Sequence, residues 1–253
     1  MRRYGQHFLV CEWVGQELSK LLDPSREDTI VEIGCGKGFL TSFTAKLGCR
    51  LLCYEIDETL VEEFKRNVSG NVELRLKDFL KVSPNEIEGA QLCYGSIPYQ
   101  ISSKIIRKVI ELGFKRCIFI VQKEFAEKLA HGRDKRRLTF ITALTQTYFD
   151  VRVLFHVPRT CFDPPPKVDS TMVELVRKRT PLDLKRYEEF LRRLFSRPNK
   201  TLKNALKTLS IDYQGPFENV RVFNANVDQI VKIYLEWCYD EGGTFRNGPQ
   251  LHS

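Results

Sequence analysis

Glycines and acidic residues near the start of the chain have the types and spacing of a nucleoside-binding site. Gly34, Gly36 and Gly38 directly follow a short β-branched run, and glycines at such a turn let a ligand approach the backbone without Cβ atoms in the way. Glu55 follows Gly34 by about 20 residues, a spacing at which a carboxylate can accept hydrogen bonds from ribose hydroxyls. A tight turn would explain the glycines alone, but the acid after them favours nucleoside binding.

The finer spacing separates two nucleoside cofactors. The glycines follow G-x-G-x-G rather than the G-x-G-x-x-G of dinucleotide sites, and Glu32 lies just before them. A carboxylate there would repel a pyrophosphate but suits a cationic ammonium group, which favours S-adenosylmethionine over NAD. Asp78 can accept a hydrogen bond from the adenine amino group while Phe79 packs near the ring, although a turn would equally explain Asp78. We also assign Ile56, which follows the ribose acid, and Ser96 to the cofactor site.

The segment Ser96–Ile97–Pro98–Tyr99 carries the groups needed to methylate an exocyclic adenine amine. The lone pair of that nitrogen is delocalised into the ring, and two hydrogen-bond acceptors would favour the tetrahedral form that attacks. We expect the Ser96 hydroxyl and the Ile97 carbonyl to be these acceptors. Pro98 would fix the backbone and Tyr99 would stack on the extruded base. A sulfonium donor is already activated, so neither a metal ion nor a strong base is required. A β-turn with an ordinary aromatic residue is the alternative for this motif alone.

The elements that must position these residues alternate between strand and helix patterns. Such alternation predicts a mostly parallel sheet covered by helices on both faces, with ligands beyond the carboxyl ends of its strands. The predicted strands are residues 29–33, 50–55, 72–76, 91–95, 116–122, 151–157 and 171–177, and the clearest helices between them are 39–47, 58–67 and 102–112.

After Pro181 the pattern becomes helical and basic. Residues 184–195, 201–209 and 227–239 are predicted to be amphipathic helices. We therefore expect a catalytic domain over 1–179, a small helical domain over 180–240 and a flexible tail over 241–253. The helical domain carries candidate phosphate-contacting residues at helical spacing, which are Arg192, Arg193, Arg197, Lys200 and Lys203.

Composition limits the remaining classes. The 253 residues carry 40 Lys and Arg against 32 Asp and Glu, a net charge of +8 that favours a polyanionic partner. No apolar run approaches the roughly 20 residues of a membrane-spanning helix. The eight cysteines form no C-x-x-C pair and lie at apolar positions, as reduced, buried cysteines do. We expect an intracellular, cytoplasmic protein.

Taken together, the motifs resemble the ribosomal-RNA adenine N6-dimethyltransferase family, in the order in which that family has them. The resemblance covers nearly all of residues 4–240 and depends on several motifs rather than on one. They are Gln6–Leu9, the loop from Glu32 to Gly38, Glu55, Asp78, Ser96–Tyr99, the segment from Phe162 to Ser170, and the basic segments from Leu194 to Arg197 and from Lys200 to Leu206.

The resemblance implies a Rossmann-like, seven-stranded methyltransferase sheet with a small C-terminal helical domain. It implies S-adenosylmethionine as methyl donor and adenosines near the 3′ end of small-subunit rRNA as acceptors, in free rRNA or in an immature subunit. We expect a monomer without a membrane partner. Carried over to this chain, Gln6 and Leu9 would touch the cofactor, Gly34 and Gly36 would line its methionine part, Glu55 would hold the ribose, Asp78 the adenine, and Tyr99 and Phe162 would sandwich the target base.

This chain departs from the family pattern at one position. The family usually has Asn where this chain has Ser96, and a hydroxyl is a shorter acceptor than an amide. Three hypotheses therefore remain: an active rRNA adenine dimethyltransferase, a ribosome-assembly or nucleic-acid-binding factor with weak or absent catalysis, and a nicotinamide-dependent oxidoreductase.

Overall fold

The computed structural model describes residues 6–130 and 137–240, so the predicted tail over 241–253 lies outside the described residues. The chain divides into two compact units, one of residues 1–127 and 151–177 and the other of residues 128–150 and 178–253. This division differs from the contiguous boundary expected near residue 179. Helix α6 (Phe140–Tyr148) precedes that boundary but packs against two C-terminal helices, α7 (Leu184–Phe195) and α9 (Val227–Asp240).

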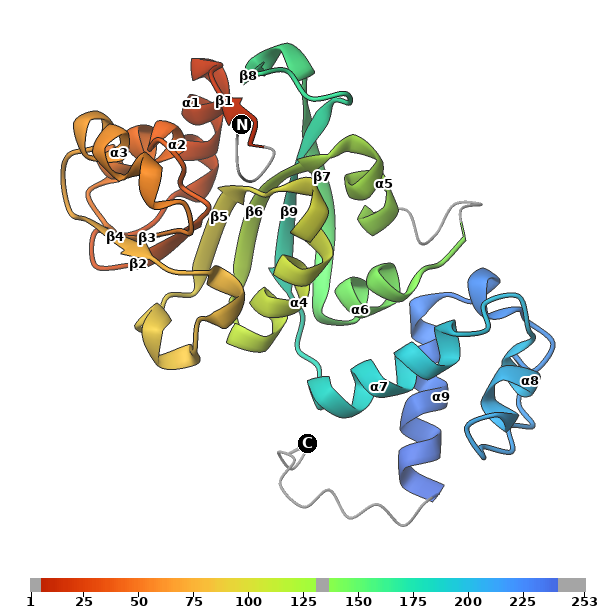
Figure 1. Cartoon of the computed structure of the whole chain (residues 1–253). Coiled ribbons are helices and arrows are strands. Elements are labelled where there is room, and N and C mark those ends of the chain that lie inside the picture. Colours follow the sequence, from red (N-terminus) through yellow and green to blue (C-terminus); the bar gives the residue numbers. More distant parts are fainter. Residues whose placement is uncertain (1–5, 131–136, 241–253) are drawn as a thin grey trace. The chain divides into compact units, whose positions relative to one another are not determined.

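The first unit is built on a seven-stranded sheet with the order β4-β3-β2-β5-β6-β9-β7 (Figure 1). The pairs from β4 to β6 are parallel, and β9 runs antiparallel to β6. The strands are β2 (Thr29–Ile33), β3 (Arg50–Glu55), β4 (Val72–Leu76), β5 (Leu92–Ser96), β6 (Arg116–Gln122), β7 (Phe149–Val157) and β9 (Ser170–Arg177). The seven-stranded sheet expected from the sequence is confirmed, with strand ends shifted by at most two residues.

The strand order reverses between β2 and β5, which places three functional segments at one edge. The chain leaves β2 toward β3 on one side, while β5 pairs with the other side of β2. Because all three strands are parallel, their carboxyl ends, Ile33, Glu55 and Ser96, lie at the same edge of the sheet.

Helices cover both faces of this sheet (Figure 1). Residues of α1 (Glu12–Leu22), α2 (Phe39–Thr44) and α3 (Val61–Asn67) form one hydrophobic cluster with the strands, and α4 (Ser102–Leu112) lies over the opposite face. The helix α5 (Lys123–Ala130) follows β6. The predicted helices over 39–47 and 58–67 each include a 3₁₀ turn, Ala45–Leu47 after α2 and Glu58–Leu60 before α3.

A separate two-stranded sheet joins the start of the first unit to a segment far along the chain. Strand β1 (Phe8–Leu9) pairs with β8 (Phe162–Asp163), and a disulfide links Cys11 to Cys161 beside it. The expectation that all eight cysteines are reduced is wrong for this pair, because strand pairing brings two residues 150 positions apart to a Cα–Cα distance of 4.9 Å. Within the described part of the chain, the other six cysteines form no disulfide.

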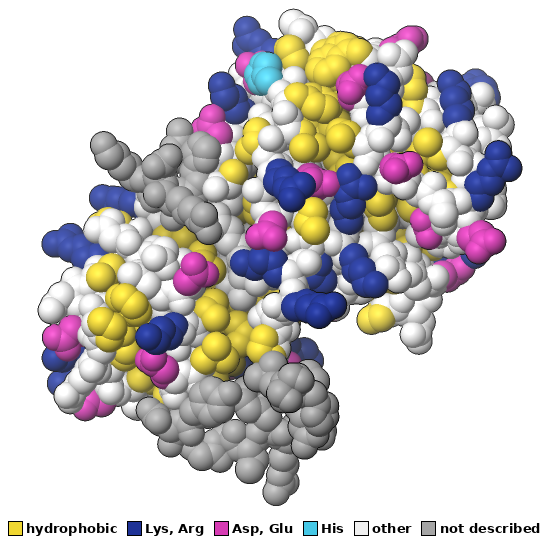
Figure 2. All heavy atoms as spheres, turned by 180° about the vertical axis from the view of Figure 1, so that it is seen from behind, with side chains coloured by type: hydrophobic (Ala, Val, Ile, Leu, Met, Phe, Trp, Pro, Cys, Tyr) yellow, Lys and Arg dark blue, Asp and Glu magenta, His cyan; other side chains and the backbone are white. Residues whose placement is uncertain are grey.

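The second unit has an aromatic core between helices. The rings of Tyr187 and Phe190 on α7 contact Tyr234 on α9, and Phe190 also stacks on Trp237. Side chains of Asp183 and Thr201 cap the first turns of α7 and of α8 (Leu202–Lys207). On the face shown in Figure 2, basic, acidic and hydrophobic side chains are interspersed. None of the described helices combines the length and the hydrophobicity of a membrane-spanning segment.

Candidate functional site

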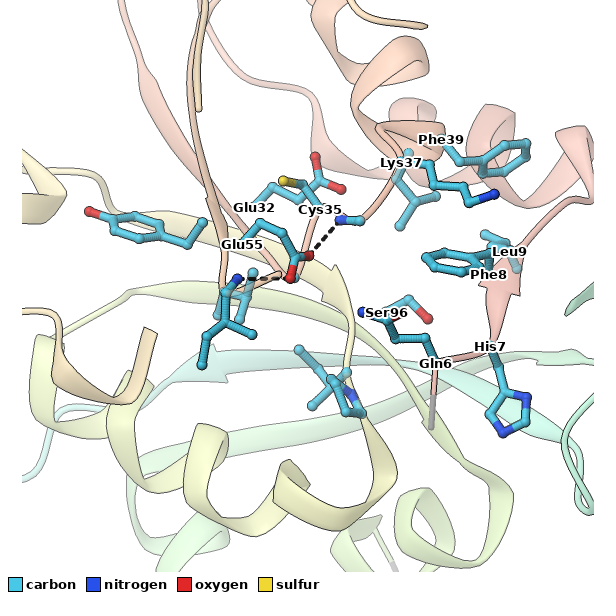
Figure 3. A pocket seen from close by; sticks show the side chains of 18 of the residues that line it. Gln6, His7, Phe8, Leu9, Glu32, Cys35, Lys37, Phe39, Glu55 and Ser96 are labelled. Carbon is cyan, nitrogen blue, oxygen red and sulfur yellow. Dashed lines mark hydrogen bonds between the residues drawn. The ribbon is translucent and has the colours of Figure 1, made fainter. Parts of the chain in front are cut away.

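One cavity of about 1160 Å³ lies at the carboxyl ends of β2, β3 and β5 in the first unit. The segment Gln6–Leu9 lines it from another side (Figure 3). The structure brings together all of the cofactor and target-base residues expected from the sequence. Those lining the cavity are Gln6, Leu9, Glu32, Gly34, Gly36, Glu55, Ile56, Asp78, Phe79, Ser96, Ile97, Pro98, Tyr99 and Phe162.

The glycine loop turns sharply between β2 and α2. Gly34 has φ of +71°, a region that residues with a Cβ adopt at a cost, and a Cβ built there would meet no atom within 4 Å. Gly38 has φ of +82°, and its Cβ would lie 2.4 Å from Val68. The first glycine thus leaves backbone open to the cavity, and the second lets α2 begin against α3.

The carboxylate of Glu55 organises this loop. It accepts hydrogen bonds from the backbone N–H groups of Gly36 (2.8 Å), Ile56 (2.8 Å) and Asp57 (2.9 Å), two of which Figure 3 marks by dashed lines. Asp57 in turn accepts a hydrogen bond of 2.8 Å from the Gln6 side chain. One buried carboxylate therefore holds the ends of β2 and β3 in fixed relation, and Asp57 joins the N-terminal segment to them.

Glu32 lies at the base of the glycine loop and is 1% exposed. Its Oε2 accepts hydrogen bonds from Thr41 Oγ1 at 2.7 Å and Tyr94 Oη at 2.8 Å, and from the Cys53 thiol at 3.8 Å. Burial nevertheless raises the pKa of Glu32 to about 7, because desolvation disfavours the charged form more than these bonds favour it. A cation bound above the loop would stabilise the carboxylate.

The residues expected near an adenine lie around the ends of β3 and β4. Asp78 Oδ1 accepts a hydrogen bond from the Leu80 N–H at 3.0 Å, as the turn explanation expects. Asp78 also lines the cavity, and its contact with an adenine stays a prediction. The Phe79 ring is buried against Tyr54, with 5.4 Å between centroids. Ile56 is 51% exposed, although it follows a buried strand. An exposed apolar side chain at the mouth of a cavity can cover the flat face of a base.

The segment from Ser96 to Tyr99 leaves the end of β5 and enters the cavity wall. The Ile97 N–H donates to the Ile120 carbonyl on β6 at 3.0 Å, and the Ile97 side chain is buried. Pro98 begins a 3₁₀ turn, Tyr99–Ile101, that leads into α4. The half-buried Tyr99 and the buried Phe162 of β8 line the same cavity. Fixed strands on both sides thus anchor the motif that is expected to hold the target amine.

The cavity is also lined by residues to which the sequence assigned no functional role, among them Lys37, Phe8 and His7. The Lys37 ammonium lies 4.8 Å from the centroid of the Phe8 ring, which places a side chain of β1 over the glycine loop. His7 Nδ1 is 2.7 Å from the Pro164 carbonyl oxygen, and its ring stacks beside Tyr99 at 6.3 Å. All three lie inside motifs that the sequence identified, but their contacts depend on pairing between distant segments.

The five basic residues expected to bind RNA lie on the second unit and fall into two groups. Arg192 donates to Glu188 and lies over the Phe140 ring at 4.9 Å, and Lys203 pairs with Glu218 at 3.0 Å. Arg193, Arg197 and Lys200 are exposed, and among the residues described none of these three lies within 4.0 Å of a carboxylate oxygen.

Comparison with known proteins gives a consistent result. A family model described as ribosomal RNA adenine dimethylase matches residues 1–236. The chain belongs to this family. Ribosomal RNA small subunit methyltransferase A of Thermotoga maritima is 39% identical over 238 residues, covering 93% of this chain and 85% of that protein. The protein of the same name from Parabacteroides distasonis is 33% identical over 244 residues, with 91% of each chain covered.

Two solved structures are also similar over most of the chain. A dimethyladenosine transferase from Plasmodium falciparum has a TM-score of 0.79 and 27% identity, covering 93% of this chain and 98% of that one. The 23S rRNA methyltransferase ErmE has a TM-score of 0.70 and 26% identity, covering 90% and 98%.

Family membership confirms the predicted enzyme class and cofactor. The protein is an rRNA adenine dimethyltransferase that uses S-adenosylmethionine, and the nicotinamide alternative is wrong. The cavity fits this cofactor, because it combines an open glycine backbone with the carboxylates of Glu32 and Glu55. A cation bound near Glu32 would lower the raised pKa of that residue.

Proposed function

We propose that this protein transfers methyl groups from S-adenosylmethionine to N6 of adenosines near the 3′ end of small-subunit rRNA during ribosome biogenesis. The observation that carries the proposal is that Ser96–Tyr99 lines the same cavity as Glu32 and Glu55. Relatives named small subunit methyltransferase A, at up to 39% identity, support the small subunit over the 23S rRNA on which ErmE acts.

Each end of the cavity has a proposed role. Glu55 and Asp78 hold the ribose and adenine of the cofactor, Gly34 and Gly36 line its methionine part, and Glu32 faces its ammonium group. When bound, S-adenosylmethionine supplies an electrophilic methyl group. Ser96 Oγ and the Ile97 carbonyl accept hydrogen bonds from the N–H groups of the target amine. Tyr99 and Phe162 hold the base between them. Ile56, Phe79, Gln6 and Leu9 complete the cofactor walls.

We propose that residues 180–240 bind RNA chiefly through Arg193, Arg197 and Lys200, which make no ion pair among the described residues. Replacing Arg193, Arg197 and Lys200 by Ala should weaken RNA binding and reduce the slope of log K against log salt by about 2, because each lost phosphate contact removes about 0.7–0.9. The matched variant replaces Arg192 and Lys203, whose charges are already paired within the protein. Equal slopes for both variants and the wild type would place the RNA elsewhere.

The activity itself is tested with labelled S-adenosylmethionine and small subunits isolated from cells that lack this modification. Mass spectrometry of the rRNA should find dimethyladenosine near the 3′ end, and large subunits serve as the control. RNA binding without methyl transfer would instead support the assembly-factor alternative.

We further propose that the protein acts as a monomer in the cytoplasm, on free rRNA or on an immature small subunit. Sedimentation of the protein with each of these two substrates tests its oligomeric state and its choice of substrate.

A further inference from the structure

The ring of Tyr99 is held by a contact that the proposed reaction does not by itself require. Its Oη lies 2.8 Å from Oγ of Ser170, and either hydroxyl can donate. Tyr99 is the first residue of a single 3₁₀ turn, and so short an element does little to fix the orientation of its side chain. A ring that stacks on a base must keep its tilt, because stacking depends on how the two planes meet.

Ser170 is anchored much more firmly than Tyr99. It is 0% exposed and begins β9, where its Cα is paired with that of Gln122 on β6. The preceding residue, Asp169, accepts the Lys123 N–H with its carbonyl at 3.0 Å and the Arg159 N–H with its carboxylate at 2.9 Å. The Ser170 hydroxyl is therefore a fixed point of the sheet from which the ring can be held.

We infer that Ser170 is a positioning residue for methyl transfer, whose hydroxyl holds the Tyr99 ring at the angle at which it stacks on the target base. The inference rests on the proposed function, because it assumes that Tyr99 stacks on an adenine. Burial raises the pKa of Tyr99, so the phenol stays neutral and can donate throughout the physiological range.

A merely structural role is the alternative, because an unpaired buried hydroxyl lowers stability wherever it lies. The second unit supplies a matched control. Tyr187 Oη lies 3.0 Å from Thr147 Oγ1, and Tyr187 is likewise buried. Tyr187→Phe removes the same kind of bond at a residue that does not line the cavity, so it should lower the melting temperature without slowing methyl transfer.

The experiment measures single-turnover methylation with saturating RNA and S-adenosylmethionine for Ser170→Ala, Tyr99→Phe, the double variant and Tyr187→Phe. We expect each single site variant to be about tenfold slower, the value of one hydrogen bond, and the double variant to be no slower than either single one. The dissociation constant of S-adenosylmethionine should change less than about twofold. With 2-aminopurine at the target position, stacking on the ring at position 99 should quench its fluorescence. Both single variants should lose this quenching, which a loss of folding stability alone does not change.

The outcomes separate the two proposals. Wild-type rates in Ser170→Ala and Tyr99→Phe, or equal slowing in Tyr187→Phe, would overturn the positioning role while methylation by the wild type upholds the function. Additive losses in the double variant would also overturn it, because the two hydroxyls would then act separately. A wild-type protein that binds RNA but transfers no methyl group would overturn both.

Discussion

The two ends of the cavity differ in how the chain builds them. The end proposed to bind the cofactor comes from β2, β3 and the turns directly after them, and Glu55 ties these turns through backbone N–H groups. The end proposed to bind the target base depends on His7, Tyr99 and Phe162, and on Ser170, which contacts Tyr99. Strand pairing and side-chain contacts bring these residues together. The first end is a product of local sequence, whereas the second exists only when the whole unit is assembled.

This difference predicts different consequences of mutation. At the cofactor end a lost side chain should weaken binding of S-adenosylmethionine, because the loop that contacts the ligand loses its fixed form. At the target end a lost side chain should slow methyl transfer while leaving cofactor affinity intact. The four experiments below test this separation.

The largest effect is expected for Tyr99→Ala, which removes the proposed stacking platform. Base–aromatic stacking contributes about 1–3 kcal/mol, so the methylation rate should fall up to about 100-fold. The dissociation constant of S-adenosylmethionine, measured by calorimetry, should stay near the wild-type value. Equal losses in rate and in cofactor affinity would contradict a division between the two ends.

Glu55→Ala should act mainly on cofactor binding. It removes the acceptor of three backbone N–H groups and the proposed ribose partner, and charged hydrogen bonds of this kind contribute about 1.5–3 kcal/mol. We expect cofactor affinity to fall about 30-fold in calorimetry. Glu62→Ala, at an exposed position on α3, is the control and should leave affinity unchanged. An unchanged dissociation constant in Glu55→Ala would remove this residue from the cofactor site.

Cofactor binding should also depend on pH through Glu32. Because its pKa is raised to about 7, the carboxyl is mostly protonated at about pH 6 and becomes charged as the pH rises. The contribution of Glu32 to folding stability changes with pH in the opposite direction. It is largest below the ordinary pKa of a glutamate and is lost as the pH rises through about 7. The affinity for the cationic cofactor should rise about eightfold from about pH 6 to about pH 7.5. Glu32→Gln should abolish this slope, and a slope that persists in that variant would assign it to another group.

The smallest effect is expected for Ser96→Asn, which installs the acceptor usual in the family. A longer amide should hold the target amine more firmly, and one improved hydrogen bond corresponds to a rate increase of about fivefold. Single-turnover rates for the first and second methyl groups give the measurement. A slower variant would mean that this cavity is shaped for the hydroxyl.

The same contrast explains how far the sequence predicted the structure. Every strand of the large sheet was predicted, because β-branched runs and the glycine turn are local signals. The cavity residues that the sequence predicted are those that follow strand ends or lie in recognisable motifs.

The rest depended on contacts across long sequence separations. The grouping of residues 128–150 with the C-terminal helices arises from packing of α6 on α7 and α9. The Cys11–Cys161 disulfide and the Ser170–Tyr99 bond join residues 150 and 71 positions apart, and nothing in the local pattern of either partner indicates the other. The ion pair of Lys203 with Glu218 likewise joins residues 15 positions apart that no local pattern links.

The pairing of β1 with β8 has a consequence for synthesis. Phe8 and Leu9 leave the ribosome early, but their partners Asp163 and Phe162 are translated more than a hundred residues later. A nascent chain can therefore complete the glycine turn long before this wall of the cavity exists. The cavity can therefore hold both the methyl donor and the methyl acceptor only after Asp163 has been translated. The enzyme becomes active late in its own synthesis.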